Sequence, residues 1–106
     1  MEAPGSKERR RTARALIATY HEAELAGLLE HVAEAIERYR RNEVDAFDVD
    51  EVIHRYTKAA RELWKFCVLG GSGSHVETLA ATLERLTAEG DLPDWWARVE
   101  RRGGNQ

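Results

Sequence analysis

An acidic and a histidine side chain are spaced so that both could bind one metal ion. Glu51 and His54 form an E-x-x-H pair in a run of helix-forming residues, and such pairs supply inward-pointing ligands to di-metal sites in helical bundles. At about 100° per residue, however, this pair points about 150° away from the apolar side of its own helix. The sequence therefore predicts no metal ion and no cofactor. A metal held between the exposed faces of two subunits is the alternative.

A second polar pair lies on the apolar side of the first helical segment. Arg14 and His21 fall on one face, and Leu25 follows one turn later. The spacing resembles the R-x-x-x-x-x-x-H motif of the helical HEPN ribonucleases, where the motif lies on a late helix beside an acidic partner. Here the match covers two residues of an early helix. We interpret His21 as a hydrogen-bonded core or interface histidine, with a polar or anion site at Arg14 and His21 as the alternative.

The segment CVLGGSGSHVETL, residues 67–79, has the glycine content of a phosphate-binding loop. A P-loop needs a lysine directly after its second glycine, and no lysine follows Lys65 in this chain. The dinucleotide-binding fingerprint needs a third glycine where Val76 stands. We therefore predict a turn between two helices, with an anion at Ser74 and His75 on the N-terminus of the next helix as the alternative.

No pattern of nucleophile and base is present. Cys67 is the only cysteine, and it lies on the apolar side of its helix, where an inert buried thiol is expected. The sequence therefore favours a protein that is not an enzyme. Enzymatic activity that uses Arg14, His21 or the turn at 70–75 stays open.

The residues between these motifs predict an all-α fold. Apolar residues recur at helical spacing, and no strand alternation appears. We expect helices over 13–41, 49–69, 75–89 and 92–101. The first two form a long antiparallel hairpin, and the two short C-terminal helices or a second subunit complete a four-helix bundle.

Capping signals set the expected starts of the later helices. Asp48 and Glu51 have the spacing of a capping box, with Phe47 placed to pack on Val52 as a hydrophobic staple. Ser74 and Glu77 predict a second capping box, and Gly90 is expected to end the third helix. The fourth helix is expected to be capped by Asp91, with Pro93 in its first turn.

Charge is unevenly distributed along the chain. Residues 1–20 carry a net charge of +3, residues 21–54 carry −7, and the whole chain carries −3. We expect a flexible basic arm over 1–11, a single helical domain over 12–101 and a flexible tail over 102–106. Within the arm, Arg9, Arg10 and Arg11 are the candidate nucleic-acid contacts.

Tryptophan is abundant for a chain of this size, with three residues in 106. Trp95 and Val99 are expected to pack the fourth helix onto the hairpin. The adjacent residues Trp95 and Trp96 cannot both point inward easily. One of this pair is therefore our candidate for a partner-binding residue, because tryptophan is enriched at interface hot spots.

Composition indicates one globular domain. Hydrophobic residues make up 42% of the chain and charged residues 33%, which excludes a disordered chain. No apolar run reaches the roughly 20 residues of a membrane span, and the first residues lack the apolar stretch of a signal peptide. With a single cysteine, the chain fits the cytoplasm, and we expect no membrane association.

Four segments together resemble a set of small actinobacterial proteins of unknown function. They are YHEAELAGLLEHVAEAIERYR, VDEVIHRYTKAARELWKFC, GSGSHVE and LPDWW, within about residues 18–97. That resemblance implies no activity. In layout only, 25–67 also resembles the small subunit of exodeoxyribonuclease VII, which lacks the Gly-Ser-His turn and the Trp-rich tail, so no role is transferred.

The functional hypothesis is a non-catalytic helical interaction or regulatory protein. It would act through homodimerisation and through a protein partner. One alternative is a nucleic-acid-associated regulator that uses the basic arm. The other is a helical protein or enzyme that binds a small molecule or anion.

Overall fold

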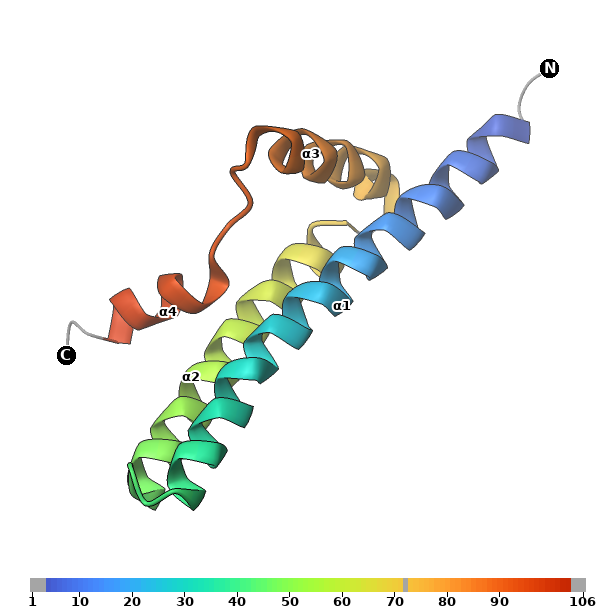
Figure 1. Ribbon diagram of the computed structural model, residues 1–106. Helices are drawn as coiled ribbons and strands as arrows, with labels where there is room; N and C mark the ends of the chain where they lie inside the picture. Colours follow the sequence, from blue (N-terminus) through green and yellow to red (C-terminus); the bar gives the residue numbers. More distant parts are fainter. Residues whose placement is uncertain (1–3, 72, 104–106) are drawn as a thin grey trace. The chain divides into compact units, whose positions relative to one another are not determined.

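The computed structural model describes residues 4–71 and 73–103, and every regular element in them is helical. Figure 1 shows the elements. The all-α prediction is confirmed. In chain order, the helical elements are α1 (Pro4–Arg40), α2 (Ala46–Trp64), a π-helical turn η1 (Lys65–Leu69), a 3₁₀ turn η2 (Gly73–His75), α3 (Val76–Glu89) and α4 (Trp95–Gly103).

The chain divides into two compact units. Unit 1 combines the chain up to Glu22 with Trp64–Pro93, and unit 2 combines Ala23–Leu63 with the chain from Asp94 onward. α1 continues from unit 1 into unit 2, with Glu22 the last residue of α1 in unit 1 and Ala23 the first in unit 2. The single domain expected over 12–101 stays a prediction.

The first helix begins earlier than expected. α1 starts at Pro4, so residues 5–11 are helical and do not form an irregular arm. Proline suits the first turn of a helix, because the donor that it lacks would have no partner there. The following Lys, Glu and Arg residues are strong helix formers, and Arg9 Nε lies 3.7 Å from Glu77 Oε1 of α3. The predicted flexibility of residues 1–3 lies outside the described residues.

Unit 1 packs the first part of α1 against the chain from η1 to α3. Gly71 lies at the closest approach: a Cβ there would come within 2.8 Å of Leu79 Cδ2 and 2.9 Å of the Cys67 carbonyl oxygen. The rings of Tyr20 and Phe66 meet edge to face, with centroids 6.1 Å apart. The buried apolar side chains of unit 1 are Ala13, Ile17, Cys67, Val76, Leu79, Ala80 and Leu83.

The helix ends in unit 1 agree with the glycine signals. Gly70 donates its N–H to the Lys65 carbonyl oxygen at 3.1 Å, so helical structure runs to Leu69, as predicted. Gly90 has a φ of 73° at the end of α3, the left-handed conformation that glycine adopts without strain. Asp91 then donates its N–H to the Leu86 carbonyl oxygen at 2.9 Å.

Unit 2 is built on an antiparallel hairpin of α1 and α2 (Figure 1). Asp45 and Asp48 cap α2 by exchanging hydrogen bonds, each N–H donating to the other carboxylate at 2.9 Å. This capping box lies three residues earlier than the one predicted, so α2 begins at Ala46. Phe47 is 82% exposed, so its predicted contact with Val52 is wrong.

The other side of the hairpin turn is held by Glu43. Its carboxylate accepts hydrogen bonds from Arg41 Nε at 2.8 Å and from Arg38 Nε at 3.3 Å. These two guanidinium groups, Arg41 above all, lower the pKa of Glu43. Asn42, with a φ of 63°, takes the left-handed position that ends α1.

The fourth helix starts later than predicted. α4 begins at Trp95, and the Ala97 N–H donates to Asp94 Oδ1 at 3.0 Å. Asp94 therefore caps α4. The prediction of Asp91 as the cap is wrong, because the Asp91 N–H closes the end of α3. Residues 104–106 of the predicted flexible tail lie outside the described residues.

Candidate functional site

The indole ring of Trp96 lies between two groups from the hairpin. The His31 ring of α1 is parallel to it within 1°, with centroids 4.0 Å apart. The Arg55 guanidinium of α2 lies 3.9 Å from the same ring. Two flat groups do not fit side by side on one indole face at these distances, so they take opposite faces. Arg55 also donates to the Trp96 carbonyl oxygen from Nη2 at 2.8 Å and from Nε at 3.2 Å. We call His31, Trp96 and Arg55 the Trp96 sandwich.

The Trp96 sandwich marks the face of the hairpin that α4 covers. Leu28 and Ala35 flank His31 by about one turn on each side of α1, and both are buried. Ala59 follows Arg55 by one turn on α2 and has no exposed surface. We call this side of the hairpin the covered face.

The predicted partner-binding pair divides into two environments. Trp95 is 5% exposed, and Val99 on the same side of α4 is also buried, so their predicted place in the core is confirmed. Trp96 is half-buried in the Trp96 sandwich. Neither indole therefore presents a free face, and partner binding by Trp95 and Trp96 stays a prediction.

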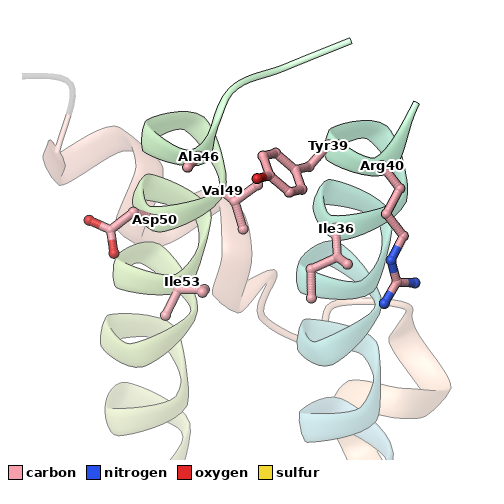
Figure 2. Close-up of a pocket in the computed structure, with 7 residues that line it drawn as sticks. All are labelled: Ile36, Tyr39, Arg40, Ala46, Val49, Asp50 and Ile53. Atoms are coloured by element: carbon pink, nitrogen blue, oxygen red, sulfur yellow. The ribbon is translucent and has the colours of Figure 1, made fainter. Parts of the chain in front are cut away.

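The opposite side of the hairpin is hollowed by an open groove of about 450 Å³, drawn in Figure 2. At about 100° per residue, Ile36 is turned about 140° from His31, and Ile53 about 160° from Arg55. The side chains of Ile36 and Tyr39 on α1 and of Val49 and Ile53 on α2 point into the space between the helices (Figure 2). We call this feature the hairpin groove; its lining residues are Ile36, Tyr39, Arg40, Ala46, Val49, Asp50 and Ile53.

The apolar surface of the hairpin groove is not covered within the described chain. Tyr39 is 48% exposed and Ile53 41%, and Leu29, one heptad before Ile36 on α1, is 48% exposed. In α2, only Ala59 and Leu63 are buried. The part of α2 nearest the hairpin turn therefore has an apolar stripe and no buried residue.

The residues proposed for a polar or anion site lie on two elements of unit 1, with Arg14 and His21 on α1 and Ser74 and His75 in η2. Binding of an anion by them stays a prediction. Arg14 and His75 are exposed, and His21 is half-buried on the first part of α1. Ser74 lies in η2, but its side chain is outside what the structure describes. Glycine is required at Gly71 because neighbouring atoms exclude a Cβ there, so packing explains this part of the loop without a phosphate.

The E-x-x-H pair lies on the solvent side of α2. Glu51 and His54 are both exposed, and His54 Nδ1 lies 3.8 Å from Asp50 Oδ2. In the described part of the chain, no group of three or more His, Cys, Asp or Glu side chains is arranged to hold a metal ion. Among the described residues, no helix has the length and apolar character of a membrane span.

The basic residues of the N-terminal segment are placed around a helix. Lys7, Arg10, Arg11 and Arg14 are exposed and fall within an arc of about 100°. Arg9 points to another side of α1, toward Glu77. Of the three predicted arm contacts, Arg10 and Arg11 therefore belong to one basic stripe and Arg9 does not.

Burial affects one carboxyl group near the start of α4. Glu24 of α1 has a raised pKa, first because burial disfavours its charged form and second because Asp94 repels it. Asp94 is the α4 cap. The covered face thus brings two acids together at the start of α4.

The side chains of Trp64 and Phe47 are exposed, which was not predicted from the sequence. Trp64 is 46% exposed at the end of α2, beside Val68 and Leu69, which are 39% and 58% exposed. Val49 and Cys67 mark the centre of the apolar side of this helix, and Trp64 lies about 60° around the helix from them. This offset was a signal in the sequence that Trp64 would be partly exposed. The exposure of Phe47 was not predicted because the capping box, and with it the hydrophobic staple, was placed three residues too late.

No protein-family model matches this chain, and neither the curated proteins nor the solved structures include one that matches it. The resemblance to small actinobacterial proteins therefore stays a prediction.

Proposed function

We propose that this chain is a non-catalytic interaction or regulatory protein of the cytoplasm that acts as a homodimer and binds protein partners. The observation that carries the proposal is the hairpin groove, an apolar surface on regular helices that no described part of the chain covers. Exposed contiguous apolar surface of this kind marks interaction sites in soluble proteins. Helical hairpins commonly bury such a face by pairing into four-helix bundles.

The test is the mass of the full chain in solution. Sedimentation equilibrium from about 1 to 100 μM, a range that brackets micromolar association, should show twice the protomer mass of 12.0 kDa. Ile53→Asp places a charge in the hairpin groove and should give a monomer. Leu69→Asp is the matched control, because Leu69 is also exposed and apolar but belongs to unit 1. A wild-type monomer at all concentrations would refute the homodimer.

Partner binding is tested by the same pair of variants. The full chain carrying an affinity tag would be used to isolate proteins from its own cells. A partner that recognises the dimer formed through the hairpin groove should be lost with Ile53→Asp and kept with Leu69→Asp. Loss with Leu69→Asp alone would move the partner site to the surface of Trp64, Val68 and Leu69.

A second function is favoured by the basic stripe on α1. Lys7, Arg10, Arg11 and Arg14 present four cations over about two helical turns, a shape that fits the phosphates of duplex DNA. We propose association with nucleic acid as the alternative. The acidic segment 21–54, at −7, would confine this contact to the first part of α1.

Fluorescence anisotropy of a labelled duplex tests this alternative. Four phosphate contacts would give a slope of log affinity against log salt near −3.6. Arg10→Ala with Arg14→Ala should halve that slope, while Arg9→Ala, off the stripe, should change it less. Absence of binding at about 50 mM salt would end this proposal.

A further inference from the structure

The two rims of the hairpin groove carry opposite charges. Arg40 lies on the α1 rim of the groove and Asp50 on the α2 rim, with the apolar side chains of Ile36 and Val49 between them (Figure 2). Arg40 Nη1 lies 2.9 Å from Glu37 Oε2, and Asp50 Oδ2 lies 3.8 Å from His54 Nδ1. Arg40 and Asp50 are 68% and 66% exposed. Exposed pairs of this kind are weak, so both charges can pair with another molecule.

A groove with one basic and one acidic rim is complementary to its own copy in one orientation. A two-fold axis within the interface and parallel to the helices places α1 of one subunit against α2 of the other, with both hairpin turns at the same end. Arg40 of each subunit then faces Asp50 of the partner subunit. An axis perpendicular to the helices would place the two turns at opposite ends and separate these charges.

We infer that the occupant of the hairpin groove is a second copy of this chain, related by the two-fold axis parallel to the helices. The interface is a four-helix bundle whose apolar seam is flanked by two Arg40–Asp50 pairs between subunits. This inference rests on the proposed homodimer and specifies its orientation.

The spacing of the groove residues supports a bundle seam. On α1, the intervals are four and three residues, from Val32 to Ile36 and on to Tyr39. On α2, they are three and four residues, from Ala46 to Val49 and on to Ile53. Alternation of three and four is the pattern that packs knobs into holes between helices. The same residues line the hairpin groove except Val32, which is half-buried.

The size of the face predicts a reversible dimer. Residues 23–40 extend about 27 Å, and two adjacent helices are about 20 Å wide. The flat area on both subunits together is therefore about 1,100 Å², near the lower limit of about 1,200 Å² for stable interfaces. In an interface of this size, two like-charge contacts should weaken association about tenfold or more.

The test exchanges the charges of the full chain. Arg40→Glu and Asp50→Lys should each weaken self-association about tenfold or more, because each places like charges together twice. An equimolar mixture of the two variants should form a heterodimer, in which both contacts join opposite charges. The double variant should dimerise like the wild type. Native mass spectrometry of mass-labelled chains would count each species.

The controls separate this inference from the proposed function. Lys58→Glu makes the same charge change as Arg40→Glu at an exposed residue of α2, about 140° from Ile53, and should leave dimerisation unchanged. If the wild type is a dimer and neither single variant weakens it, the orientation is wrong and the homodimer stands. If the wild type is a monomer, both the homodimer and its orientation are wrong. Circular dichroism would check that each variant is helical.

Discussion

The two faces of the unit 2 hairpin are made from the same two helices, but they are stabilised differently. On the covered face, α4 adds Trp95 and Trp96, and the hairpin residues beneath it are buried or stacked on an indole. On the face with the hairpin groove, Tyr39 and Ile53 keep more than two-fifths of their surface exposed. The two faces of the hairpin therefore differ in how far the described chain covers their apolar residues, and the proposed dimer would cover the second face.

The largest effect is expected where the covered face is broken. Trp95→Ala removes a side chain that is 5% exposed, and replacing a buried aromatic residue by alanine costs about 3–5 kcal/mol of unfolding free energy. Urea unfolding followed by circular dichroism would measure the loss. A cost below about 1 kcal/mol, the level of surface changes, would show that α4 does not stabilise unit 2.

Trp96→Ala should lower the free energy of unfolding by less, about 1.5–3 kcal/mol. Trp96 is only half-buried, but the variant loses the ring stack with His31 and the cation–π contact with Arg55. Trp64→Ala is the matched control. Trp64 is 46% exposed, so the Trp64→Ala variant should lose less than about 1 kcal/mol of unfolding free energy. Equal losses in the two variants would contradict the difference between a stacked and an exposed indole.

Ile53→Ala on the open face should separate association from stability. Ile53 is 41% exposed, so the protomer should lose at most about 1 kcal/mol when unfolding is measured at low concentration. The dimer dissociation constant should rise about tenfold, since each subunit loses the same contact. Sedimentation equilibrium would measure it. A large loss of protomer stability would place Ile53 in the folding core.

The smallest effect concerns Glu24 near the α4 cap. Burial and Asp94 raise its pKa, so the folded state disfavours the charged form, and the contribution of Glu24 to stability falls as pH rises through that pKa. Glu24→Gln should therefore stabilise the protein at pH 7 by at most about 0.5 kcal/mol. The gain should shrink as pH falls toward the ordinary value of 4.5, where Glu24 becomes protonated.

Thermal unfolding at pH 7 and at about pH 4, near the ordinary pKa of a glutamate, would measure this difference. Glu30→Gln, at an exposed residue of the same helix, is the control and should show a smaller difference. A gain for Glu24→Gln that persists at the lower pH would mean that the gain does not come from its titration.

Helical periodicity and glycine placement were enough to predict the fold class and most helix ends. The apolar stripes predicted the hairpin, Gly70 and Gly90 predicted the ends of their helices, and Trp95 with Val99 was placed in the core. These features depend on local backbone preferences and on side-chain spacing within one helix. They can be read from the sequence because neighbouring residues determine them.

Competition between equivalent local signals limited the remaining predictions. Asp48 was predicted to open the capping box of α2, and in the structure it closes the box that Asp45 opens. Asp91 was predicted to cap α4, and Asp94 caps it instead. Pro4 was interpreted as part of an arm, although it also suits the first turn of a helix.

What the sequence determined by itself is therefore the all-α class, the hairpin and the apolar stripe on each helix. Only the tertiary structure decided which edge of that stripe is covered. Contacts distant in sequence made the choice: Arg55 and Trp96, 41 residues apart, bring α4 onto one face of the hairpin. The hairpin groove exists because α4 packs on the opposite face, and no spacing within one helix contains that information.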